Sequence, residues 1–151
     1  MTRRISLLVA FLCLMASMPV AAAKPGDHVH GTILGYEVCT LQLCGQAIFT
    51  GDFAGKVNGT RTLGFFLVTA IHGDLPVVTG GTTAVTGEWA ISTEEGSFKG
   101  TVTEGTLTYN GDETFKVVLL LQTTSGGDFP LGFTGTLDHS SWPTISGKVS
   151  G

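Results

Sequence analysis

Apolar and polar residues alternate along most of the chain, which is the pattern of strands that bury one face. Threonine and glycine are abundant, with 22 glycines among 151 residues, and no segment beyond residue 23 has the apolar spacing of a helix. The chain is therefore predicted to be all-β. About eight strands are expected, over residues 31–38, 46–57, 60–71, 85–92, 98–109, 112–123, 131–138 and 144–150.

An Asn-Gly pair stands between the second and third of these strands, and Asn-Gly is favoured at the tip of a two-residue hairpin because both residues tolerate positive φ. With this pair, residues 58–59, as the tip, Phe53 lies opposite Gly64 and Phe66 opposite Gly51. Each aromatic ring then covers the bare backbone of its cross-strand partner. A slip of one residue would move every side chain to the other face, so the register is well specified.

A second Asn-Gly pair, residues 110–111, predicts a similar hairpin of residues 98–109 with residues 112–123. In this register Val102 lies opposite Leu119. Gly100 lies opposite Leu121.

A motif of apolar residue, any residue, glycine, any residue, apolar residue recurs in four predicted strands. Its first copy is Phe49-Thr-Gly51-Asp-Phe53, and the others lie at residues 98–102, 133–137 and 145–149. The glycine shares the inward face with the two apolar residues, where it permits strong coiling or close approach of another backbone. Eight such antiparallel strands favour a single small closed barrel, with a two-sheet sandwich as the alternative. The strands resemble those of avidin-like and lipocalin-like barrels, and this resemblance implies a ligand pocket in the barrel mouth.

The first 23 residues have the features of a signal peptide. Arg3 and Arg4 precede an apolar run over residues 5–20, and alanines occupy positions 21–23, which is the order that export and cleavage require. The run is shorter than the roughly 20 residues that span a bilayer. We therefore expect a cleaved signal peptide over residues 1–23 and a single all-β domain over residues 24–151, exported to the periplasm or the medium.

The charge of the mature chain argues against two classes of partner. Cleavage would remove Arg3 and Arg4, leaving six Lys and Arg against twelve Asp and Glu, a net charge near −6. Nucleic acids and anionic lipids attract clusters of Lys and Arg, so neither is an expected partner. No second apolar run is long enough to span a bilayer, and no cofactor is expected.

Two cysteines remain after cleavage, Cys39 and Cys44. Export places them in an oxidising compartment, where they are expected to form a disulfide. A metal site or a redox motif is the alternative, but a lone C-x4-C is a weak zinc pattern. Closing so short a loop stabilises the fold by about 2 kcal/mol, which makes the disulfide a local staple.

The segment Asp27-His28-Val29-His30 is a candidate metal site, because His28 and His30 would point the same way in a strand. His72 and His139 could complete the site, although no sequence feature places them nearby. The alternative is that histidines so close to the mature terminus are simply solvent-exposed.

Three large amphipathic side chains are candidate ligand contacts if one end of the barrel is open: Trp89, Tyr109 and Trp142. Trp89 is the favoured one. The competing interpretation is that the Trp89 ring fills one end of the core.

Glu104 is a weak catalytic candidate. Unbroken alternation from Phe98 would place it on the core-facing side, where desolvation would raise its pKa and make it a general acid or base near neutral pH. A β-bulge at Glu104-Gly105 would instead return the carboxylate to water and bring Leu107 and Tyr109 inward. We favour the bulge.

Three functions remain open at this point. The leading one is a non-enzymatic barrel that binds a small apolar molecule or a surface partner through one open end. The others are a small-barrel cyclase or isomerase with a buried carboxylate, and a structural or adhesion protein with a solid core. A pocket without a buried ionisable group favours the first, a pocket with one favours the second, and a filled interior favours the third. The oligomeric state is left open.

Overall fold

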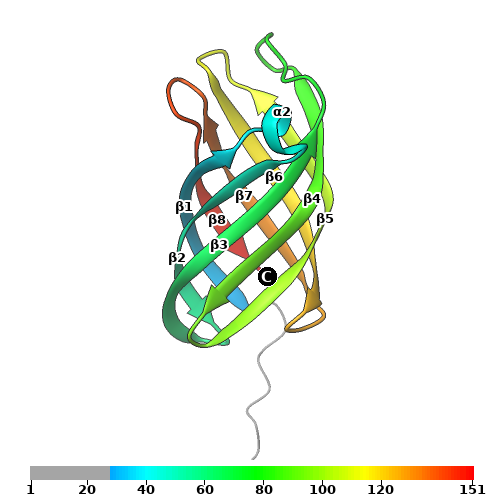
Figure 1. The fold of residues 1–151 in the computed structure, drawn as a ribbon. Coiled ribbons are helices and arrows are strands. Elements are labelled where there is room, and N and C mark those ends of the chain that lie inside the picture. Colours follow the sequence, from blue (N-terminus) through cyan, green and yellow to red (C-terminus); the bar gives the residue numbers. More distant parts are fainter. Residues whose placement is uncertain (1–27) are drawn as a thin grey trace, which may run out of the picture.

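The computed structural model describes residues 28–151, and the expected signal peptide, residues 1–23, lies outside this part of the chain. Eight antiparallel strands close into a barrel in which each strand pairs with its neighbours in sequence and β8 pairs with β1 (Figure 1). The predicted barrel is confirmed, and the two-sheet alternative is wrong. The strands are β1 (Val29–Cys39), β2 (Ala47–Val57), β3 (Thr60–His72), β4 (Thr82–Thr93), β5 (Gly96–Tyr109), β6 (Thr114–Ser125), β7 (Pro130–Asp138) and β8 (Thr144–Ser150).

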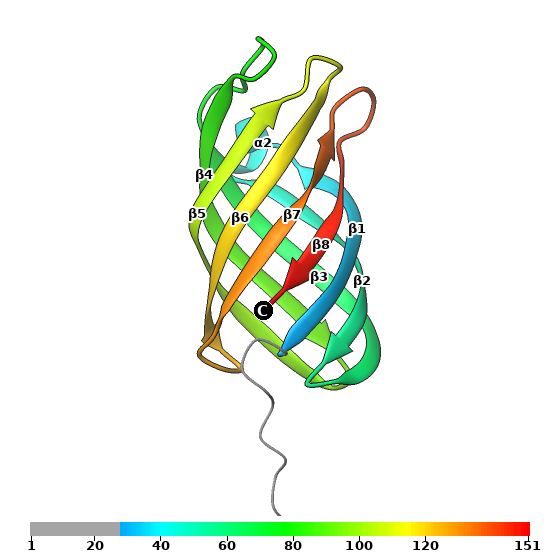
Figure 2. The same cartoon turned by 180° about the vertical axis from the view of Figure 1, so that it is seen from behind.

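The two ends of the barrel differ, as the front and back views show (Figures 1 and 2). One end, called the α2 end below, carries the short helix α2 (Leu41–Cys44) and the connections after β3, β5 and β7. The other, called the C-terminal end, carries the connections after β2, β4 and β6 and the last residue, Gly151. Backbone hydrogen bonds of 2.9 and 3.0 Å from His28 and Val29 to Gly151 join the start and finish of the barrel there. Within residues 28–151, no helix is long and apolar enough to cross a membrane.

The first hairpin has the predicted register. Phe53 pairs with Gly64, and Phe66 pairs with Gly51. Asn58, the first residue of the turn, has a φ of 48°, as a type I′ turn requires. The local turn signal therefore fixes how β2 and β3 align.

Gly51 also marks a close approach of β1 and β2, where it pairs with Gly35. A Cβ atom at Gly51 would collide with the carbonyl oxygen of Leu34 and the Cα atom of Gly35, both of which are backbone atoms. A Cβ atom at Gly35 would likewise collide with the Phe66 ring, which lies against this glycine. Glycine on the inward face thus lets the strands coil tightly, as its motif predicts.

The second hairpin departs from the predicted register. Val102 pairs with Leu121 rather than Leu119, and Gly100 pairs with Thr123 rather than Leu121. The expectation failed because residues 110 and 111 do not form a two-residue tip by themselves.

The connection between β5 and β6 is instead a wider loop held by its own side chains. The Asp112 carboxylate accepts hydrogen bonds from the backbone N–H and the hydroxyl of Thr114. Asn110 N donates to the Thr114 carbonyl oxygen at 2.9 Å, and Glu113 adopts a φ of 63°. Because of these bonds, β6 begins at Thr114 instead of residue 112, and β5 and β6 pair in a different register from the expected one.

β5 also contains a register shift between Val102 and Glu104, one residue before the predicted bulge. The shift has the predicted effect on the side chains. Glu104 is exposed, Gly105 and Leu107 are buried, and Tyr109 is half-buried. The favoured alternative for Glu104 is therefore confirmed, and its core-facing placement is wrong.

The barrel interior is filled toward the C-terminal end. Val29, Phe53 and Val57 are at most 1% exposed. Phe129, from the connection between β6 and β7, packs edge-on against Phe98 with ring centroids 5.7 Å apart. Each fully buried side chain of this kind stabilises the fold by about 1.5–3 kcal/mol relative to its exposed state. This packed half supports the opposite end, where the interior is hollow.

Candidate ligand cavity

A cavity of about 290 Å³ opens at the α2 end of the barrel. All eight strands contribute to its wall, and helix α2 and the connections after β1, β3 and β7 complete it. Its lining is predominantly apolar, which is typical of small-molecule sites. The lining residues are Glu37, Thr40, Leu41, Gln42, Phe49, Val68, Ala70, His72, Leu75, Val85, Val102, Leu107, Val117, Leu119, Leu137, His139, Pro143 and Ile145.

A second, smaller void of about 40 Å³ lies along the same interior. It shares Val68, Leu119 and Ile145 with the main cavity, so the two are neighbours along the barrel axis. Its wall is apolar and includes Trp89. A ligand in the main cavity would therefore rest on an apolar floor.

Glu37 is the buried carboxyl group of the cavity, with 7% of its surface exposed. It follows Ile33 and Gly35 on the inward face of β1, and a register shift lies just beyond it in the pairing with β2. Its backbone is fixed from outside: Glu37 N donates to the Pro143 carbonyl oxygen, and Trp142 Nε1 donates to the Glu37 carbonyl oxygen, both at 3.0 Å. Burial raises the pKa of the Glu37 carboxyl, because the charged form loses its hydration.

His72 lies at the end of β3 and lines the same cavity. Its Nδ1 donates to the Gly73 carbonyl oxygen at 2.7 Å. That bond places the proton of the neutral ring on Nδ1, which leaves Nε2 able to accept one. The positive form of His72 lowers the pKa of Glu37, but burial has the larger effect and the net shift is upward.

His139 follows β7 and is the third titratable residue on the lining. Its ring lies edge-on to Phe115, with centroids 5.7 Å apart, and its backbone N–H donates to the Glu113 carbonyl oxygen at 2.8 Å. Burial lowers the pKa of His139, and the charge of His72 lowers it further, against the opposing effect of Asp138. The lowered pKa favours the neutral form of the His139 ring on the cavity wall.

Helix α2 lies at the cavity mouth and is held by the predicted disulfide. Cys39 and Cys44 are bonded, with their Cα atoms 6.1 Å apart. The helix ends at Gly45, whose φ of 70° and N–H bond to the Leu41 carbonyl oxygen form a left-handed cap. Since Leu41 and Gln42 line the cavity, the disulfide holds part of its rim in place.

The three aromatic candidates occupy different places. Trp89 is buried, lines the smaller void, and donates from Nε1 to the Thr101 carbonyl oxygen at 3.2 Å. The Tyr109 ring packs on Phe115 with centroids 5.1 Å apart and does not line the main cavity. Trp142 is 66% exposed and supports the Glu37 backbone from outside.

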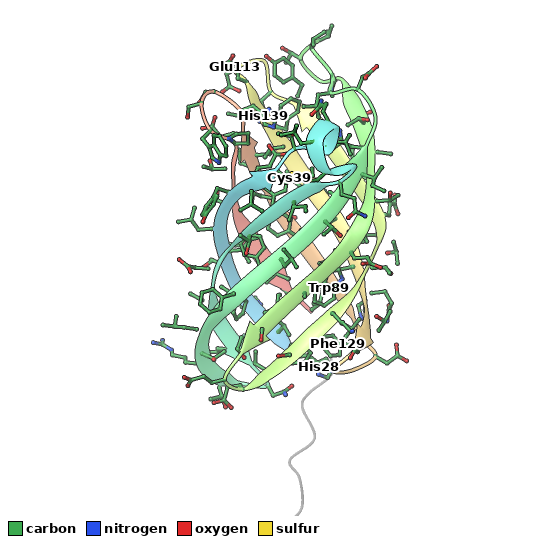
Figure 3. The ribbon with its side chains drawn as sticks, in the orientation of Figure 1. His28, Cys39, Trp89, Glu113, Phe129 and His139 are labelled. Carbon is green, nitrogen blue, oxygen red and sulfur yellow. A yellow bond between two sulfur atoms is a disulfide. The ribbon has the colours of Figure 1, made fainter. Side chains whose placement is uncertain are left out.

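His28, the first histidine candidate for metal binding, lies at the C-terminal end, away from His139 (Figure 3), and His30 lies close to it near the start of β1. His28 stacks on Phe129, with centroids 4.2 Å apart, and His30 is exposed on the outer face of β1. The structure therefore does not bring His72 and His139 to His28 and His30. Within residues 28–151, no group of three or more His, Cys, Asp or Glu residues is placed to hold a metal ion.

Alternation along the strands contained a signal for two cavity residues. Glu37 was not a sequence candidate, and His72 was considered only as a possible metal ligand. Alternation from Ile33 carries Glu37 to the inward face of β1, and alternation from Phe66 carries His72 to the inward face of β3. His139 lies beyond the end of its strand, so alternation gives no direction for its side chain.

Comparisons with protein-family models, with curated proteins and with solved structures gave no match to this chain.

Proposed function

We propose that the mature chain acts outside the cytoplasm and binds a small, largely apolar molecule in the cavity at the α2 end. The main support is the cavity itself, which all eight strands line with mostly apolar side chains. The Cys39–Cys44 disulfide supports action in an oxidising compartment. A solid interior would favour the structural or adhesion function, and a cavity of about 290 Å³ gives that function no such support.

The cavity limits the size and chemistry of the ligand. A water molecule takes up about 30 Å³ of liquid volume, so the space suits a ligand of about ten non-hydrogen atoms. Glu37 and His72 are polar groups among apolar neighbours, so a molecule with an apolar body and one hydroxyl or amine group fits both features. Burial of the apolar body would give a negative heat-capacity change on binding.

Filling the cavity from β3 tests this function. Ala70 is buried and lines the cavity, whereas Ala84 is exposed on the outer face of β4. Small aromatic and alicyclic alcohols and amines would be titrated calorimetrically into the wild type, Ala70→Phe and the control Ala84→Phe. We expect Ala70→Phe to lower the affinity at least about 100-fold and Ala84→Phe to leave it unchanged. Equal binding by all three proteins would contradict a ligand site in the cavity.

A pocket that contains a buried ionisable group favours an enzyme, and Glu37 is such a group. We therefore propose acid–base catalysis on the bound molecule as a second function, which includes binding in the same cavity. The Glu37 carboxyl has a raised pKa because of burial, and His72 presents Nε2 as a proton acceptor when its ring is neutral. A carboxyl group with a raised pKa in an apolar cavity is typical of enzymes that move protons within a substrate. An isomerase or cyclase is the class of enzyme that such a site would serve.

Deuterium exchange tests this second function with a simple probe. A base that removes the proton next to a carbonyl group returns deuterium from D₂O, so small enolisable ketones would gain deuterium detectable by NMR. We expect exchange by the wild type, at least about 10-fold slower exchange by Glu37→Gln, and unchanged exchange by Glu104→Gln, whose carboxylate is exposed. No exchange by the wild type would contradict catalysis on carbonyl compounds and leave binding intact.

A further inference from the structure

The outer face of β1, β2 and β3 carries many large apolar side chains, all of them on β1 and β3. We call it the β1–β3 face, and its members alternate with the inward residues of the same strands. Most of the outer faces of β5, β7 and β8 consist instead of Thr, Ser and Lys. The large exposed side chains of the β1–β3 face are Leu34 (63%), Tyr36 (51%), Val38 (47%), Leu63 (74%), Phe65 (67%), Leu67 (44%) and Ile71 (47%).

Strand pairing places these side chains in rows on either side of β2. Leu34 and Phe65 flank Asp52 of β2 in one row, and Tyr36 and Leu67 flank Thr50 in the next. The Thr50 hydroxyl donates to the Phe66 carbonyl oxygen at 2.9 Å, so its polar group is already bonded to the strand pair. The β1–β3 face therefore presents apolar side chains from β1 and β3 on both sides of β2, with the exposed Asp52 carboxylate between them.

The area of this patch matches what a stable dimer needs. The exposed fractions of its large side chains add up to about four fully exposed residues. At roughly 150–200 Å² for each residue, this is an exposed area of about 600–800 Å². A standard protein interface buries about 800 Å² from each partner. Monomers rarely leave an apolar patch of this size in water.

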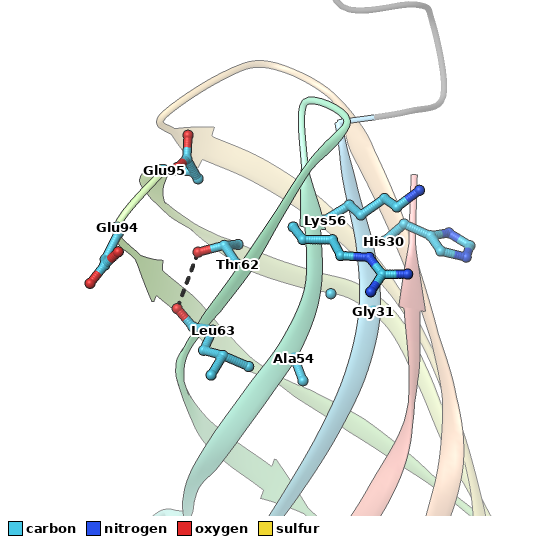
Figure 4. Close-up of a pocket in the computed structure, with 10 residues that line it drawn as sticks. His30, Gly31, Ala54, Lys56, Thr62, Leu63, Glu94 and Glu95 are labelled. Carbon is cyan, nitrogen blue, oxygen red and sulfur yellow. Dashed lines mark hydrogen bonds between the residues drawn. The ribbon is translucent and has the colours of Figure 1, made fainter.

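The C-terminal part of the face adds a separation of charge (Figure 4). A shallow groove there contains Ala54 and Leu63. His30 and Lys56 project on one side of it, and Glu94 and Glu95 lie on the β4–β5 turn on the other side. Arg61 pairs with Lys56 across β2 and β3, so it belongs to the basic side.

We propose that two copies of the chain associate through the β1–β3 face about a two-fold axis over the Ala54–Leu63 groove. A two-fold interface brings the same patch of both copies together. The basic side of one groove then meets the acidic side of the other, twice in each dimer, while Phe65 and its neighbours bury their apolar surface. The groove is thus complementary to itself in charge, and a second copy is the occupant that fits it.

Analytical ultracentrifugation of the mature protein over a concentration series tests the association. We expect a monomer–dimer equilibrium with dimer formed below about 100 µM. Phe65→Ser should weaken dimerisation at least about 100-fold, because a central aromatic anchor is lost. Leu120→Ser is the matched control, since Leu120 is 50% exposed on β6, outside the face, and it should change the constant less than about 3-fold. The proposal would be overturned if the protein stayed monomeric throughout this range, or if Phe65→Ser left the dimerisation constant unchanged.

A charge exchange between copies tests the two-fold geometry. Arg61→Glu and Glu95→Arg should each weaken self-association about 10-fold, because each places like charges together at two contacts. Mixed in equal amounts, the two variants should form a heterodimer close to wild-type strength, since both contacts then join opposite charges. Failure of the mixture to recover dimerisation would overturn the proposed axis even if Phe65 proved essential. Near-ultraviolet circular dichroism of buried Trp89 would report that each variant is folded.

Discussion

Thr123 is a buried residue, 2% exposed, whose hydroxyl has no hydrogen-bond partner within residues 28–151. A buried hydroxyl without a partner loses its hydration without compensation. Thr123→Val keeps the shape of the side chain and removes this cost, so we expect the free energy of unfolding to rise by about 1 kcal/mol. Urea denaturation monitored by circular dichroism measures the change.

Thr50 is the matched control for this prediction, because its hydroxyl donates to the Phe66 carbonyl oxygen at 2.9 Å. Thr50→Val should lower the free energy of unfolding by about 1 kcal/mol, the usual net value of such a bond. If Thr123→Val were as destabilising as Thr50→Val, the Thr123 hydroxyl would have to be bonded in solution.

Glu37 gives the stability of the fold a specific pH dependence. Burial raises its pKa in the folded state above the reference value of 4.5, so over that interval the folded state binds more protons than the unfolded state. Stability therefore falls as pH rises from about 4.5 through the raised pKa. Glu37→Gln removes this effect. We expect the variant to gain stability relative to the wild type across that interval, and then to keep a constant advantage.

Urea titrations of both proteins between about pH 4 and about pH 8 measure the difference. Taking the difference between the two proteins cancels the contributions of the other titrating groups, including His139 and Asp138. A difference that stayed flat with pH would mean that the Glu37 carboxyl is hydrated in solution.

At the scale of elements, local signals predicted the strands and one register well. Alternation gave all eight strands to within a few residues, and the turn at residues 58–59 gave the pairing of β2 with β3. The pairing of β5 with β6 was missed because side-chain bonds of Asp112 and Thr114 widen their loop. Such bonds depend on where the loop directs its side chains, which the order of residues does not specify.

The close approach of β1 and β2 gives a prediction at this scale. A methyl group at Gly51 would meet only backbone atoms, which cannot move aside without separating the strands. We expect Gly51→Ala to lower the free energy of unfolding by about 3 kcal/mol. Thermal denaturation of purified variants measures the loss.

Gly132 on β7 is the control for Gly51, because the nearest atom to an added Cβ there is the Ser150 carbonyl oxygen at 3.9 Å. Gly132→Ala should leave stability unchanged or raise it by about 0.5 kcal/mol through reduced freedom of the unfolded chain. Equal effects at both positions would contradict a steric role for Gly51.

At the scale of the molecule, the cavity could be predicted only in part. A closed barrel and inward alternation lead to an interior with Glu37 and His72 on its wall. Which end remains hollow depends on the connections: Phe129 contributes to the filled C-terminal end, whereas Leu41 and Leu75 line a cavity at the α2 end. Connections have no regular alternation, so their side chains could not be placed from the sequence.

The two proposed sites are separated within the same strands, and this separation predicts their energetic independence. On β3, Phe66 and Val68 face the interior while Phe65 and Leu67 face outward. The charged groove lies toward the C-terminal end, and the cavity opens at the α2 end beyond the packed core. A dense core resists small displacements. Ligand binding in the cavity is therefore not expected to change the relative stability of monomer and dimer.

We therefore expect a cavity ligand to change the dimerisation constant less than about 3-fold, and dimerisation to change ligand affinity by the same factor, since coupling is reciprocal. Calorimetric titration of the wild type above its dimerisation constant, and of monomeric Phe65→Ser, measures the second quantity. Ultracentrifugation with saturating ligand measures the first. Coupling of about 10-fold or more in both measurements would mean that β3 shifts as a unit when the cavity fills, and that the ligand controls association through this strand.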